Sequence, residues 1–154
     1  MLESRHFGKL DGSDCAEGEA NFEGSPLRFD VNLANPAAFE AASLAEVDRA
    51  LDELDAWVAI ARAAFRTAMS DPKEQPLQFW EFHRDDVAGY ADLPREAFVD
   101  ALKLQRVGFY PDGAFGAEAW LVLDFVLTGG EPSDQILVAK LSKDRGLLAI
   151  AWES

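Results

Sequence analysis

The chain of 154 residues contains one cysteine, Cys15, and only two histidines, His6 and His83. A single cysteine cannot close a disulfide within the chain, and it cannot supply the several thiolates of a cysteine-based zinc site. With so few nitrogen and sulfur ligands, the chain offers no persuasive zinc or iron site. We therefore predict that the protein holds no metal and no cofactor.

Long apolar runs are also missing. No segment approaches the roughly 18 consecutive apolar residues that a membrane-spanning helix requires. The first ten residues lack the apolar stretch of a secretory signal peptide. These absences predict no membrane partner and a cytoplasmic location, with a reducing bacterial-type cytoplasm as the default.

Basic residues are scarce. Lysine and arginine total 14 against 28 aspartates and glutamates, which gives a formal net charge of −14. Such a surface repels the phosphate backbone of nucleic acids and the head groups of anionic lipids, so we predict no nucleic-acid partner. The charge serves solubility in the plainer interpretation, and it favours a basic protein as a partner in the sharper one.

Motifs that carry known chemistry are absent. The sequence has no GxxxxGK[ST] phosphate loop, no GxGxxG after a strand, no HExxH and no GxSxG. Carboxylates are plentiful, but carboxylate catalysis needs a raised pKa inside a cleft, which a sequence does not reveal. The sequence gives no reason to call the protein an enzyme.

What the chain does contain is a large apolar fraction. Hydrophobic residues make up 49%, with 11 phenylalanines and 4 tryptophans. This composition is typical of a folded domain, and the length suits one domain, residues 1–154, better than two.

The central segment 43–70 predicts one long amphipathic helix of about 40 Å. Ser43 and Glu46 have the spacing of a capping box at its start. The large apolar residues recur at helical spacing along one side: Leu44, Val47, Leu51, Leu54, Val58, Phe65 and Met69.

Strands are predicted on both sides of this helix. A short strand at 6–10 and an acidic loop at 11–18 precede a hairpin with strands at 19–23 and 27–33, turning at 24–26. Shorter helices are expected at 77–90 and 94–102. A C-terminal meander is expected with strands at 103–110, 119–127, 134–141 and 147–152. The fold class is therefore α+β, with two layers: a mostly antiparallel sheet of about five to seven strands against one long and two shorter helices.

Alternation along the C-terminal strands predicts that both sheet faces are apolar. One face is expected to pack on the long helix, and the other is covered either by the second helix or the hairpin, or by another chain. Charged residues interrupt that second face, and we expect them to pair there as a structural ion cluster or as an anchor for a ligand. The candidate binding residues are Arg106, Trp120, Asp124, Lys140 and Trp152.

His83 lies in an aromatic stripe of the second predicted helix. With Asp86 or Asp85 nearby, it is a secondary candidate for a titrating base. A buried histidine satisfied by a hydrogen bond is the plainer interpretation.

Three segments resemble a family of small bacterial proteins classed as a domain of unknown function. They are the F-G-x-L-D start at Phe7–Asp11, the R-V-G-x-Y-P segment at Arg106–Pro111 and the final Glu153–Ser154. The resemblance implies a cytoplasmic α+β domain and carries over no catalytic residue.

Two functions of different classes remain. The first is a non-enzymatic protein-interaction module, of an inhibitory or immunity type, that binds a basic protein or a second copy of itself. The alternative is a small-molecule-binding or catalytic domain that uses His83 with Asp86, or Arg106 with Asp124.

Overall fold

The computed structural model describes residues 2–154. Its main sheet has six strands in the order β3 (Cys15–Phe22), β4 (Ser25–Asn32), β5 (Leu102–Phe109), β6 (Leu121–Leu127), β7 (Ile136–Leu141) and β8 (Leu147–Glu153). Every neighbouring pair is antiparallel except β4 and β5, which are parallel. The predicted α+β class and the C-terminal meander are confirmed.

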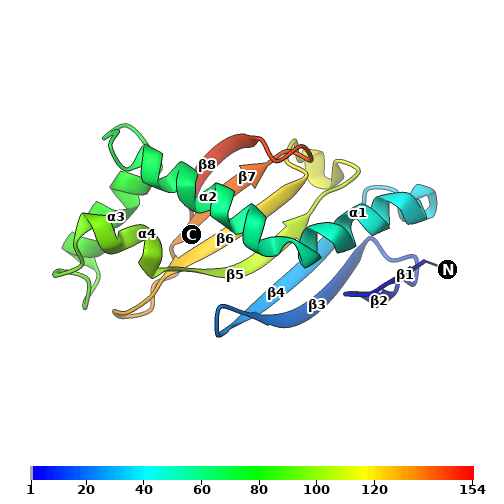
Figure 1. Ribbon diagram of the computed structural model, residues 1–154, viewed down its shortest axis with the longest axis horizontal. Helices are drawn as coiled ribbons and strands as arrows, with labels where there is room; N and C mark the ends of the chain where they lie inside the picture. The colour runs from blue at the N-terminus through cyan, green and yellow to red at the C-terminus, as the bar shows by residue number, and fades with distance from the viewer. Residues whose placement is uncertain (1) are drawn as a thin grey trace.

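The parallel pair dictates where the helices lie. Parallel neighbours need a long crossover, and here residues 33–101 make it. This crossover contains α1 (Ala41–Asp52), α2 (Leu54–Ala68), α3 (Gln75–Asp86) and the short α4 (Phe98–Ala101). Figure 1 shows these helices on one side of the sheet, with α2 lying across its strands.

The remaining face of the sheet, which we call the open face, is covered by none of these helices. The predicted internal cover is therefore wrong, because the N-terminal hairpin β3–β4 extends the same sheet instead of lying over it. From the strand registers, the open face carries the side chains of Glu17, Glu19, Arg28, Asp30, Lys103, Arg106, Val122, Asp124, Val126, Ile136, Val138, Lys140, Ala149, Ala151 and Glu153.

The helix-covered face holds the large apolar side chains. Phe65 of α2 meets Phe125 of β6 edge to face, with ring centroids 5.3 Å apart. Each large side chain buried in this way contributes about 1.5–3 kcal/mol. The fully buried members of this layer include Val31, Ala61, Phe65, Phe79, Phe98, Phe109, Leu121, Leu123, Phe125, Leu137 and Leu141. The open face, by contrast, carries mostly smaller apolar side chains mixed with charges, so its predicted apolar character holds only in part.

The long helix predicted at 43–70 is wrong as one piece. It is broken at Glu53, whose φ of −107° and ψ of 25° are not helical, so α1 and α2 are separate helices. No proline or glycine marks the break. A straight rod of that length diverges from a twisted sheet, and the break lets α1 bury Val47 and α2 bury Phe65 in one core.

The predicted capping box is also absent. Helix α1 begins at Ala41 with Glu40 as its N-cap, and no side chain caps it. Ser43 therefore lies inside the first turn of the helix. Its backbone N–H donates to the carbonyl oxygen of Glu40 at 3.1 Å.

Element boundaries in the N-terminal third differ from the prediction. Strand β3 begins at Cys15, inside the segment predicted as a loop, and the hairpin turns at Glu23–Gly24. Both turn residues have positive φ, 50° and 77°. Such φ values are typical of two-residue hairpin turns. In residues 2–154 no helix has the length and apolar character needed to cross a membrane.

The N-terminal segment with β1 (Glu3–Ser4) and β2 (Gly8–Lys9) is attached to α1 by a buried carboxylate. The Ser4 hydroxyl donates to Oδ1 of Asp48 at 2.5 Å, and the Arg5 N–H donates to Oδ2 at 3.2 Å. Asp48 is only 6% exposed. Since buried carboxylates need hydrogen-bond donors, this pairing fixes where the first ten residues lie.

We predict that Asp48→Ala lowers the free energy of unfolding by about 1–3 kcal/mol, because it leaves the buried Ser4 hydroxyl without its acceptor. Amide hydrogen exchange in residues 2–10 should also speed up. Asp55→Ala is the matched control, since Asp55 is exposed on α2; its stability should change by less than about 0.5 kcal/mol. Unchanged exchange in residues 2–10 of Asp48→Ala would contradict the prediction.

Candidate functional site

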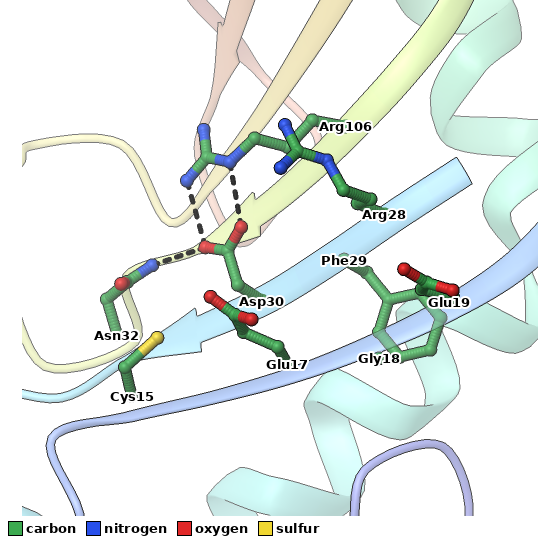
Figure 2. A pocket seen from close by; sticks show the side chains of 9 residues that line it. All are labelled: Cys15, Glu17, Gly18, Glu19, Arg28, Phe29, Asp30, Asn32 and Arg106. Carbon is green, nitrogen blue, oxygen red and sulfur yellow. Dashed lines mark hydrogen bonds and ion pairs between the residues drawn. The ribbon is translucent and has the colours of Figure 1, made fainter. Parts of the chain in front are cut away.

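Arg106 lies at the centre of the open face, on β5. Its direct neighbours are Arg28 on β4 and Asp124 on β6. Its guanidinium binds Asp30 through two hydrogen bonds, from Nε at 2.7 Å and from Nη2 at 2.9 Å, as Figure 2 shows. Such a paired geometry is the strongest form of an arginine–carboxylate contact.

Gly108 makes this contact possible. It lies opposite Asp30 in the parallel register, two residues along β5 from Arg106. A Cβ atom at Gly108 would come within 2.6 Å of Nη2 of Arg106. The guanidinium therefore reaches Asp30 by lying over the bare backbone of this glycine.

The hydrogen-bonding capacity of Arg106 is almost fully used inside the protein. Besides the two bonds to Asp30, Nη2 donates to the Tyr110 hydroxyl at 2.9 Å and Nη1 donates to Oδ2 of Asp124 at 3.3 Å. Burial disfavours the charge, but the hydrogen bonds to Asp30 and Tyr110 outweigh it, so the pKa of Arg106 is raised. Arg106 is consequently a poor receptor for an anionic ligand.

Asp124 is the less satisfied member of the cluster. It is 9% exposed, and its one hydrogen bond, within residues 2–154, comes from Arg106 to Oδ2. Burial raises the pKa of Asp124, and the nearby Arg106 only partly opposes this shift. A raised folded-state pKa means that stability falls as the pH rises through that pKa, so ionised Asp124 costs stability at neutral pH.

Two hollows flank Arg106 on the open face. The first, the Glu17 hollow, has a volume of about 510 Å³ and is shown in Figure 2. It lies over β3 and β4, and its charged lining residues are Glu17, Glu19, Arg28, Asp30 and Arg106.

The second hollow, the Asp124 hollow, has a volume of about 740 Å³. Asp124 and Val122 of β6 line it together with Leu148 of β8 and Phe115 of the β5–β6 loop. Its other charged lining residues are Arg106, Glu118, Lys140 and Glu153.

Lys140 does not join Arg106 and Asp124 in the ion cluster expected on this face. It lies opposite Val122, and its Nζ pairs with Glu153 at 3.6 Å. The structure therefore brings Arg106 and Asp124 together and places Lys140 at a separate ion pair in the wall of the Asp124 hollow.

The candidate binding residues Trp120 and Trp152 do not lie on the same face as Arg106 and Asp124. The Trp120 ring stacks on Trp57 of α2 at 5.7 Å, and Trp152 packs against Phe79 of α3 at 5.7 Å, so both lie on the helix-covered face. For Trp152 the reason is a β-bulge: Leu141 pairs with Leu147 and Lys140 with Ala149, which leaves Leu148 as an extra residue. The bulge reverses the alternation of β8. For Trp120, regular alternation begins only at Leu121, the first residue of β6.

His83 and Asp86 are not brought together. His83 is fully buried, with Nδ1 2.8 Å from the Phe79 carbonyl oxygen and Nε2 2.9 Å from the Ser133 hydroxyl. Asp86 is exposed, and Asp85 pairs with Arg84. His83 is therefore a core histidine satisfied by hydrogen bonds, as in the plainer interpretation of the sequence.

Asp30 and Phe115 were missed by the sequence-based prediction. Alternation along β4 places Asp30 on the polar side, but its pairing with Arg106 depends on the parallel contact of β4 with β5, 76 residues apart. The sequence did contain one signal for this pair, since Asp30 and Arg106 are opposite charges that each occur in a predicted strand. Phe115 lies in a loop, where periodicity gives no information.

Comparisons with protein-family models, with curated proteins and with solved structures found no match. Within residues 2–154, no three His, Cys, Asp or Glu side chains are grouped in a way that could hold a metal ion.

We predict that Arg106→Met lowers the free energy of unfolding by about 3–5 kcal/mol, because it leaves two largely buried carboxylates, Asp30 and Asp124, without their cation. Arg28→Met is the control on the neighbouring strand, since Arg28 is exposed and in no ion pair of the described chain. It should change stability by less than about 0.5 kcal/mol. Urea unfolding measures both variants, and equal effects would show that the Arg106 pairing contributes little.

We predict that His83 makes the free energy of unfolding depend on pH. Burial lowers the pKa of His83 below its ordinary value of 6.5. The unfolded chain then binds a proton more readily than the folded protein, so stability falls as the pH drops from 6.5 to the lowered pKa. The slope is at most about 1.4 kcal/mol per pH unit.

Unfolding curves across this window should lose that slope in His83→Gln and keep it in His6→Gln. His6 is the matched control, since it lies on the N-terminal segment and pairs with Asp52 at 2.9 Å. A slope that survives in His83→Gln would assign the effect to another group.

Proposed function

We propose that the protein is a non-enzymatic interaction module that binds a basic protein partner through the open face, in the manner of an inhibitor or immunity protein. The observation that carries the proposal is the composition of the Asp124 hollow. Phe115 is 88% exposed and Leu148 is 51% exposed, and both line it beside the largely buried Asp124.

Exposed apolar side chains next to partly desolvated charge are typical of binding surfaces. Within residues 2–154 the large hydrophobic residues with high exposure are Phe115, Leu147 and Leu148. Two of these three line one hollow, which supports a shared role.

Charge favours a basic partner. The protein carries a net charge of −14, so its field attracts cations over a long range and raises the rate of encounter. A second copy of the chain would bring the same negative charge to the interface, which disfavours self-association.

The catalytic or small-molecule alternative with Arg106 and Asp124 has less support. The raised pKa of Asp124 suits a general base, but the donors of Arg106 are occupied by its neighbours. Among residues 2–154, no serine, threonine, cysteine or histidine lines the Asp124 hollow.

The β8 bulge provides a matched pair of variants. Leu147 and Leu148 are adjacent and similarly exposed, at 43% and 51%. Leu147 pairs with Leu141 of the helix-covered face, whereas Leu148 lines the Asp124 hollow. The same substitution to serine at each position therefore separates the two faces at little cost to stability.

We expect the immobilised wild-type protein and Leu147→Ser to retain the same basic protein from a lysate of the cells that make it. With that partner purified, Leu148→Ser should weaken binding at least about tenfold, and binding should weaken with salt. Equal affinities for Leu148→Ser and Leu147→Ser would refute the proposal. So would light scattering that shows a dimer of wild type but not of Leu148→Ser.

A further inference from the structure

We propose that the Asp124 hollow receives an arginine or lysine side chain of a basic protein partner, with Asp124 accepting the cation and Phe115 and Leu148 packing on its aliphatic stem. The inference rests on the proposed function and names the chemistry that the open face recognises.

The charges around the hollow favour a cation. Arg106 is shared between Asp30, at 2.7 Å, and Asp124, at 3.3 Å, and Lys140 pairs with Glu153. Asp124 therefore has only a share of one cation, and Glu118 in the lining is exposed and in no ion pair of residues 2–154. The hollow therefore presents an excess of negative charge after its internal pairs are counted.

Asp124 has capacity for a further donor. Its Oδ2 accepts from Nη1 of Arg106 at 3.3 Å, a long contact, while no hydrogen bond reaches its Oδ1 from residues 2–154. The Asp124 side chain is 13% exposed, and it lines the hollow. A guanidinium or ammonium group there would supply the compensation that Arg106, shared with Asp30, does not.

Phe115, which lines the hollow, has an unusual backbone conformation. Its φ of 59° and ψ of 21° are left-handed, a conformation that non-glycine residues rarely adopt, and Gly113 and Gly116 on either side also have positive φ. A phenylalanine that is strained and almost fully exposed has no stabilising role in the free protein. Such strain is concentrated at binding sites, and lysine and arginine stems pack well against apolar side chains.

The occupant is a side chain of a protein rather than a free amine, because the apolar walls extend beyond one cation. Leu148 and Ala149 of β8 line the hollow together with Val122 of β6 and with Phe115 and Ala117 of the β5–β6 loop. Its volume of about 740 Å³ exceeds that of a single side chain, so neighbouring apolar residues of the partner fit beside the cation.

The test titrates the full chain with the peptide acetyl-Leu-Arg-Leu-amide and measures the backbone amide chemical shifts of the protein by NMR. Its control is the same peptide with citrulline, which keeps the shape of arginine without its charge. We expect shifts at Val122, Asp124 and Ala149, and at least tenfold weaker binding of the citrulline peptide.

Two variants and one control complete the experiment. Asp124→Asn keeps an oxygen that accepts a hydrogen bond from Arg106. We expect it to lower the affinity for the arginine peptide at least tenfold without loss of thermal stability. Phe115→Asn introduces a residue that tolerates the left-handed backbone, so the fold should be kept. We expect this variant to bind both peptides more weakly. Asp92→Asn, an exposed carboxylate between α3 and the turn Arg95–Ala97, should leave binding unchanged.

The inference is overturned if the arginine peptide shifts none of these amides at millimolar concentration, if citrulline binds equally, or if Asp124→Asn binds as wild type does. The proposed function fails separately, on the comparison of Leu148→Ser with Leu147→Ser. If Leu148→Ser weakens binding of the purified partner but Asp124→Asn does not, the open face binds a protein and the assignment of a cation subsite at Asp124 is wrong.

Discussion

The structure depends on the junction between β4 and β5, where two segments separated by the whole helical crossover meet in parallel. The paired hydrogen bonds from Arg106 to Asp30 span this junction, and the Asn32 side chain spans it again by donating to the Phe109 carbonyl oxygen at 3.3 Å. Without this junction the N-terminal hairpin and the C-terminal meander would be separate sheets. Side-chain pairing therefore supplements a parallel ladder, which is the less stable kind per residue.

The same junction explains why one face is left open. A sheet with a single parallel crossover receives its helices in one connection, and that connection lies on one side. All the large aromatic packing is consequently on that side, including both tryptophans expected elsewhere. The open face retains the polar cluster. Arg106 lines both hollows of this face, the Glu17 hollow over β3 and β4 and the Asp124 hollow, which β6 and β8 line.

Two features of the Asp124 hollow lower the stability of the free protein. Ionised Asp124 is costly to bury, and the left-handed backbone of Phe115 holds an apolar ring in water. Neither feature helps the free protein to fold. Features that lower stability persist where a bound partner compensates for them, which is the physical basis for the proposal that this hollow is a recognition surface.

The sequence by itself determined the fold class, the order of the elements and the alternation that separates Leu121 and Leu123 from Val122 and Asp124, because these follow from local periodicity. It also marked Arg106 and Asp124 as charges in apolar strands. Only the tertiary structure decided the partner Asp30, the break at Glu53, the faces of Trp120 and Trp152 and the exposure of Phe115. Parallel pairing, sheet twist and a one-residue bulge act between distant segments, so no window of the sequence contains them.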